Sequence, residues 1–164
     1  PSMIQPVATP TSPLRTYVLL HTYFKSLLNG VQGAHAVADL LVKYPEADGL
    51  PQTWARDHKT LVFLDGGVSL HIHQTIAWLK SMSSTSIPWA AFVEDSATLE
   101  NMTTAIAITL PESIAKASDE DVDRAEWHSE GPLWDELQAL GVDLLTLNAT
   151  IAFLRWLRSR PLAS

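Results

Sequence analysis

Two polar side chains stand one helical turn apart in a stretch of small residues. The stretch is "NGVQGAHAVADLLVKYP", and it holds Gln32 and His35 among glycines and alanines. Residues three apart share one face of a helix, so the amide and the imidazole point the same way. Small neighbours let a substrate backbone approach the start of the helix closely. A second interpretation stays open, in which His35 is a packed, hydrogen-bonded side chain beneath a strand.

Acids and hydroxyls at the ends of apolar runs are the next candidates. Glu94 and Asp95 follow "IPWAAFV", and Thr103 and Thr104 begin "TTAIAITLP". Strand ends in open α/β sheets carry ligand-facing groups, and a carboxylate there can take a proton from an attacking water. A threonine hydroxyl can hold that water or an oxyanion. A polar turn and ordinary strand threonines explain the same residues structurally, and strand alternation favours a structural role for one threonine.

Metal and nucleotide chemistry find less support in the sequence. The "HIH" run from His71 to His73 lies in a predicted helix, where residues two apart do not face each other. The chain has no cysteine, no Gly-x-Ser-x-Gly elbow and no glycine-rich phosphate loop. We therefore predict neither a metal nor a cofactor.

The elements that position these residues alternate along the chain. Apolar and β-branched runs predict strands at 15–24, 59–67, 87–95 and 103–111, and helical spacing predicts helices at 29–44 and 68–82. The order β-α-β-α-β-β predicts an α/β fold with a mixed four-stranded sheet flanked by helices. The helical crossovers favour parallel pairing, and the short last connection favours one antiparallel pair. The segment "PEADGLP" after the first helix is a predicted loop.

The 164 residues, 46% of them hydrophobic, have room for one domain. We expect a flexible, proline-rich leader at 1–14 without signal-peptide features, an α/β domain at 15–111, and an acidic, helical extension at 112–164. The apolar stretch at 144–157 is too short to cross a bilayer, so we expect a soluble, cytoplasmic protein. The last helix is apolar over much of its circumference and predicts either cover by the body or a homodimer through the C-terminal helices.

The net charge of −7 is confined to one segment. Nine acidic and two basic residues lie between Glu112 and Glu136, so the rest of the chain is neutral overall. Acidic proteins bind nucleic acid poorly because the phosphate backbone is held by Lys and Arg. The position of this acidic segment in the fold therefore decides whether the remaining surface is compatible with an RNA ligand.

The order of these motifs resembles the type 2 peptidyl-tRNA hydrolases, and most closely the divergent, phage-like members of that superfamily. The matching pieces are "VQGAHA", "KTLVFL", "FVEDS" and "TTAIAI", and they span about residues 17–111. Where the family has a lysine-rich approach to the first helix, this chain has "KSLLNG", with Lys25 a few residues earlier. Its Asp-Ala-Gly-x-Thr-Gln run is replaced by "EDSATLEN", in which Glu94 takes the place of the aspartate.

The resemblance implies a cytoplasmic hydrolase that cleaves the ester between a peptide and the tRNA 3' end without a cofactor. It implies catalytic roles for Glu94, Thr104 and His35, and substrate-binding roles for Gln32, Lys25, Lys59 and Asp95. The alternative is a catalytically inactive relative that acts as a protein-binding or assembly module through its C-terminal extension.

Overall fold

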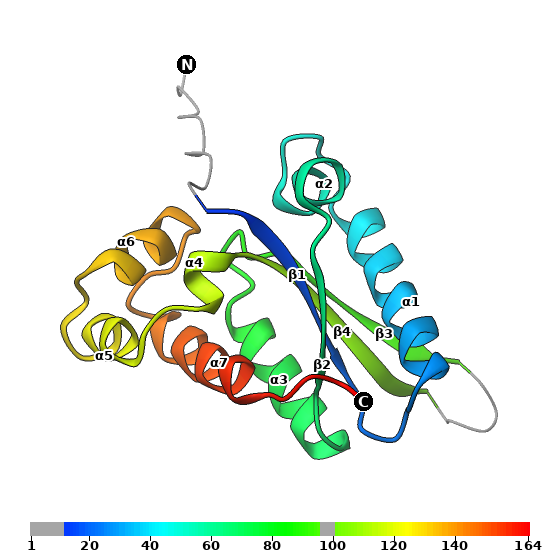
Figure 1. Cartoon of the computed structure of the whole chain (residues 1–164). Helices are drawn as coiled ribbons and strands as arrows, with labels where there is room; N and C mark the ends of the chain where they lie inside the picture. The colour runs from blue at the N-terminus through cyan, green and yellow to red at the C-terminus, as the bar shows by residue number, and fades with distance from the viewer. Residues whose placement is uncertain (1–11, 96–100) are drawn as a thin grey trace.

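The computed structural model describes residues 12–95 and 101–164 of the chain (Figure 1). The strands are β1 (Leu14–Leu20), β2 (Leu61–Asp65), β3 (Trp89–Glu94) and β4 (Met102–Pro111). The helices are α1 (Leu27–Lys43), α2 (Leu50–Thr53), the π-helical turn η1 (Trp54–His58), α3 (Ser69–Ser81), α4 (Glu112–Ala115), α5 (Asp119–His128), α6 (Pro132–Ala139) and α7 (Leu147–Ser159).

The four strands form one mixed sheet in the order β2-β1-β4-β3. This confirms the predicted α/β fold. Strand β1 pairs with β2 in parallel, and β4 runs antiparallel to both β1 and β3. The sheet thus has two antiparallel pairings where the sequence predicted one, because β4 lies between β1 and β3 (Figure 1). The central position suits β4, since its residues from Thr104 onward are all buried.

Helix α1 covers one face of the sheet through small side chains. Ala36 and Leu40 pack in a cluster with Val18 and Leu20 of β1 and with alanines of β3 and β4. Small side chains on both sides let the helix lie close to the strands. Gly33 belongs to this contact, because a Cβ there would stand 2.8 Å from Cζ of Phe63. Part of the small-residue pattern of α1 is therefore a packing requirement.

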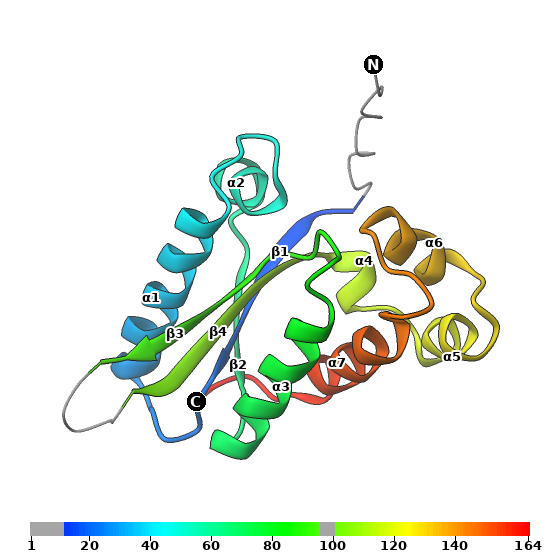
Figure 2. The ribbon, with the colours of Figure 1, turned by 180° about the vertical axis from the view of Figure 1, so that it is seen from behind.

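The opposite face of the sheet carries the larger core. Helices α3 and α7 lie side by side on it (Figure 2). From α7, Ile151, Phe153, Leu154 and Leu157 are all buried. The body of the same chain thus covers the apolar surface of α7, which was the reason to expect a homodimer. The homodimer remains a prediction, and the apolar surface of α7 no longer supports it.

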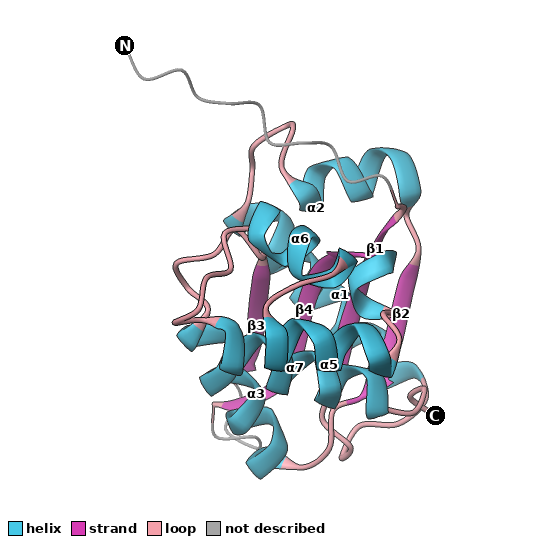
Figure 3. Cartoon of the chain, turned by 90° about the vertical axis from the view of Figure 1, so that its left-hand side faces the viewer, coloured by secondary structure: helices cyan, strands magenta, loops and turns pink. Residues whose placement is uncertain are grey.

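The acidic segment contains α5, which packs against α6 and α7 (Figure 3). Arg155 of α7 contacts Asp123 at 2.9 Å and Glu126 at 3.1 Å. Hydrogen bonding to these carboxylates, Asp123 first, raises the pKa of Arg155. Arg158 contacts Asp119 at 2.8 Å. Part of the negative charge is therefore used to hold α5 on α7.

The ends of the predicted segments differ in detail from the structure. Of the predicted leader, residues 1–11 lie outside the described residues, whereas Leu14 begins β1 and is 1% exposed. The segment predicted as a loop after α1 leads into α2. Gln52 of α2 donates hydrogen bonds to the carbonyls of Leu41 and Tyr44, and so ties α2 to the end of α1. Within 12–95 and 101–164, no helix has the length and apolar character needed to cross a membrane.

One edge of the sheet collects the ends of several elements. Since β1, β2 and β3 run in the same direction, their carboxyl ends meet there, and antiparallel β4 begins there. Helices α1 and α3 begin at this edge because each follows a strand that ends there (Figure 1). We call it the carboxyl edge, and its residues include His21, Asp65, Glu94 and Thr104.

Candidate functional site

Three predicted residues from three elements form a chain of hydrogen bonds at the carboxyl edge. The Thr104 hydroxyl donates to Oε1 of Gln32 at 2.6 Å, and Nε2 of Gln32 donates to Oε2 of Glu94 at 3.2 Å. Thr104 comes from β4, Gln32 from α1 and Glu94 from the end of β3. We call this group the Gln32–Glu94–Thr104 triad.

A β-bulge turns Thr104 toward α1. Phe92 pairs with Ala105 and the next residue, Val93, pairs with Thr103, so Thr104 is the extra residue on β4. A bulge of this kind changes the direction of a side chain and is common beside active sites. Thr104 is fully buried, whereas Thr103 is only half-buried. The bulge therefore decides which of the two predicted threonines joins the triad.

The hydrogen bonds fix the orientation of the Gln32 amide. Its oxygen accepts from Thr104, so its NH₂ group must face Glu94, which as a carboxylate only accepts. One N–H of this NH₂ group contacts Glu94, and among the residues that the structure describes the other N–H has no hydrogen-bond acceptor. Gln32 is 5% exposed and Glu94 is half-buried. The triad thus presents a carboxylate beside an amide donor whose direction is set by a buried hydroxyl.

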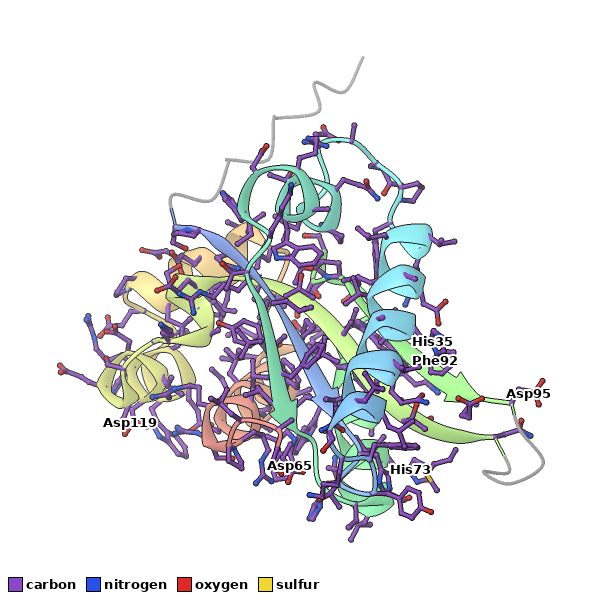
Figure 4. All side chains as sticks on the ribbon, turned by 45° about the vertical axis from the view of Figure 1, so that its right-hand side comes forward. His35, Asp65, His73, Phe92, Asp95 and Asp119 are labelled. Carbon is purple, nitrogen blue, oxygen red and sulfur yellow. The ribbon has the colours of Figure 1, made fainter. Side chains whose placement is uncertain are left out.

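His35 and Asp95 lie near the triad but do not belong to it. The exposed His35 lies one turn beyond Gln32, with its ring centroid 4.5 Å from that of Phe92 (Figure 4). The exposed Asp95 follows β3 and points away from α1 (Figure 4). Among the described residues, neither side chain hydrogen-bonds to Gln32, Glu94 or Thr104. The predicted roles of both residues remain predictions.

The two predicted lysines lie at opposite edges of the sheet. Lys25 is exposed in the turn before α1, at the carboxyl edge. Lys59 follows η1 with φ of 61° and precedes β2. The next residue, Thr60, accepts a hydrogen bond from the backbone of Thr16 near the start of β1. The structure therefore brings Lys25 to the edge that carries Glu94 and places Lys59 at the far end of the sheet.

A second polar cluster at the carboxyl edge was not predicted. Nε2 of His21 lies 3.0 Å from Oγ of Ser69, and the backbone N–H of Tyr23 donates to Nδ1 of the same ring. In the neutral ring the proton therefore sits on Nε2, which donates to Ser69. Burial lowers the pKa of His21, and the negative charge of Asp65 offsets part of this decrease. A neutral ring in this tautomer cannot take the Ser69 proton, so the pair is not a nucleophile with its base.

The sequence carried a signal for this second cluster. His21 follows β1 and Asp65 ends β2, and parallel neighbouring strands bring their carboxyl ends together. Oδ1 of Asp65 accepts the backbone N–H of Gly67 at 2.8 Å, which holds the turn into α3. His21, Asp65 and Asn29 line a small cavity of about 10 Å³. A space of this size admits about one water molecule.

The acidic helix α5 lies on the other side of the molecule from the triad. Asp119 is at one side of Figure 4, whereas His35, Phe92 and Asp95 are at the other. Helix α5 packs on α6 and α7, and α7 lies on the sheet face opposite to α1. The surface around Glu94 is therefore free of the charge concentrated in α5.

The described part of the candidate site contains no metal-ligand cluster. In the part of the chain that the structure describes, no three His, Asp or Glu side chains gather closely enough to hold a metal ion. His71 and His73 lie on α3, where the His71 ring packs against Trp156 with the ring centroids 5.1 Å apart.

Neither the protein-family models nor the curated proteins give a match to this chain.

Proposed function

We propose that the chain is a peptidyl-tRNA hydrolase-like protein that hydrolyses the ester between a peptide and the tRNA 3' end. The observation that carries the proposal is the Gln32–Glu94–Thr104 triad at the carboxyl edge. These three residues are predicted site residues from separate parts of the sequence, and a carboxylate beside an oriented amide donor suits ester hydrolysis.

The chemistry follows from the orientation of the two groups. Glu94 takes a proton from a water molecule, and the water oxygen attacks the carbonyl carbon of the ester. The second N–H of Gln32 donates to the oxyanion that forms. The bond from this carbon to the ribose oxygen then breaks, Glu94 returns its proton to that oxygen, and a free acid and the terminal hydroxyl result.

The charges around Glu94 agree with a role as a base. Within the described residues, no Lys, Arg or His lies within ion-pair distance of Glu94, whereas five other carboxylates are held by arginine or lysine. Among these residues, no cation therefore competes with a water molecule for the Glu94 carboxylate.

The test is hydrolysis of a peptidyl-tRNA by the wild type and by Glu94→Gln. We expect the variant to lose about 100-fold or more in kcat, the usual contribution of a general base. The control is Glu46→Gln, which removes an exposed carboxylate from the loop after α1. A Glu94→Gln variant that folds and retains wild-type turnover would overturn the proposed mechanism.

A binding module is the second candidate, and a different observation favours it. The C-terminal extension exposes large apolar side chains, with Trp127 73%, Leu144 69% and Leu145 93% exposed. Exposed apolar groups of this kind are typical of interaction surfaces. Absence of turnover in wild type and variant alike, with both chains folded by circular dichroism, would favour this alternative.

A further inference from the structure

Three apolar side chains at the start of α1 are exposed beside the triad. Leu27 is 81% exposed, Leu28 is 53% exposed and Val31 is 41% exposed. We call these three residues the α1 rim. Single exposed apolar residues are ordinary, but these three occupy the first two turns of one helix. Tyr23, in the turn that leads to α1, is also 67% exposed.

The helix geometry joins the α1 rim to the triad. Leu28 stands four residues before Gln32, so the two side chains lie on one side of α1, about 5–6 Å apart at Cβ. Val31 directly precedes Gln32 and stands one turn after Leu27. A group that accepts from the second N–H of Gln32 would therefore bring its nearest substituents onto the α1 rim.

The size of the α1 rim identifies the kind of occupant. A stable protein interface uses roughly 20–30 residues on each side. Three side chains around the first turns of a helix are far too few for that, but they are enough to contact one amino-acid side chain. The rim also borders buried polar side chains, since Asn29 lies between Leu28 and Val31 and Gln32 directly follows Val31.

The few cationic side chains at the carboxyl edge also favour a small occupant. Lys25 is the cation in the turn that leads to α1. Other cationic side chains are engaged or lie elsewhere: Lys43 donates to the carbonyl of Trp89 at the far edge, Arg15 pairs with Glu112, and Arg160 lies over the Trp156 ring. A polyanion is held by many such contacts, so little of the tRNA body would be gripped here.

We propose that the α1 rim is the subsite for the amino-acid side chain next to the scissile ester, and that it selects apolar side chains. The inference rests on the proposed hydrolase function and names its substrate class: esters of N-acylated apolar amino acids with a terminal ribose. The α1 rim contacts the side chain, while Gln32 donates to the oxygen of the ester carbonyl beside it and Glu94 takes the proton of the attacking water.

The test compares two esters of adenosine, N-acetylleucyl and N-acetylasparaginyl, whose side chains are similar in size. For the wild type we expect kcat/KM to favour the leucyl ester by about tenfold, within the range of apolar pocket discrimination. In Leu27→Gln combined with Leu28→Gln, the preference should fall to about twofold or less, mainly through KM. Glutamine keeps the helix propensity of leucine.

The matched control is Val42→Gln on the last turn of the same helix. Val42 is 80% exposed, close to Leu27, and stands about 22 Å away along the axis. It should retain the wild-type preference. Equal hydrolysis of both esters by the wild type would overturn the inference and leave the hydrolase function standing. No hydrolysis of either ester or of peptidyl-tRNA would overturn both.

The same variants also test whether the α1 rim binds another occupant. Light scattering across protein concentrations would detect a second copy of the chain, and flotation with neutral phosphatidylcholine vesicles would detect a lipid surface. Self-association or vesicle binding that disappears in the Leu27→Gln and Leu28→Gln variant, but not in Val42→Gln, would overturn the assignment to a substrate side chain.

Discussion

At the scale of single residues, the Thr104 hydroxyl decides which way the Gln32 amide faces. We expect Thr104→Val to leave Oε1 of Gln32 buried without a donor, which costs about 1–3 kcal/mol of stability. The amide is then no longer oriented, and kcat should fall by about tenfold or more. Thr104→Ser keeps the hydroxyl and should restore most of the turnover. The measurements are urea unfolding and hydrolysis of the leucyl ester.

The serine variant separates positioning from simple packing. Valine keeps the shape of the fully buried threonine and removes the donor, whereas serine loses a methyl group and keeps the donor. If the two variants lose the same fraction of kcat at saturating ester, the hydroxyl does not orient Gln32, and Thr104 is only a core residue of β4.

At the scale of elements, α1 uses its two interior glycines differently. A Cβ at Gly30 would meet nothing within 4 Å, whereas a Cβ at Gly33 would press on the ring of Phe63. We expect Gly30→Ala to raise the free energy of unfolding by about 0.5–1 kcal/mol, the usual gain for alanine over glycine inside a helix. Gly33→Ala should gain less or lose stability, because the Phe63 ring must move. Urea unfolding of the two variants tests this, and equal gains would show that the ring moves freely.

At the scale of the whole molecule, the acidic charge and the candidate site are separated. Asp123→Asn removes one exposed partner of Arg155 and should lower the free energy of unfolding by less than about 1 kcal/mol. Hydrolysis should stay within about twofold of the wild type at physiological salt, where the screening length is about 8 Å. A larger change in kcat/KM would mean that the charge of α5 acts at the carboxyl edge.

Local patterns in the sequence determined the types of the main elements. Apolar runs predicted all four strands, and helical spacing predicted α1 and α3, because these patterns reflect which side chains each element buries. The helical spacing of Gln32 and His35 identified Gln32, and polar residues at strand ends identified Glu94 and Thr104; the structure brings these three side chains together. Signals of this kind depend on neighbouring residues and can be read before the chain is folded.

Only the tertiary structure decided how these elements meet. Strand pairing is a long-range choice, and the insertion of β4 between β1 and β3 follows from burying its apolar residues on both faces. Pairing of β4 with β3 creates the bulge that selects Thr104. Parallel pairing of β1 with β2 places Lys59 at the far edge and brings His21 beside Ser69. The sequence by itself determined the elements and the candidate polar groups. Contacts between distant segments decided which groups share a site, because those contacts depend on packing across the whole sheet.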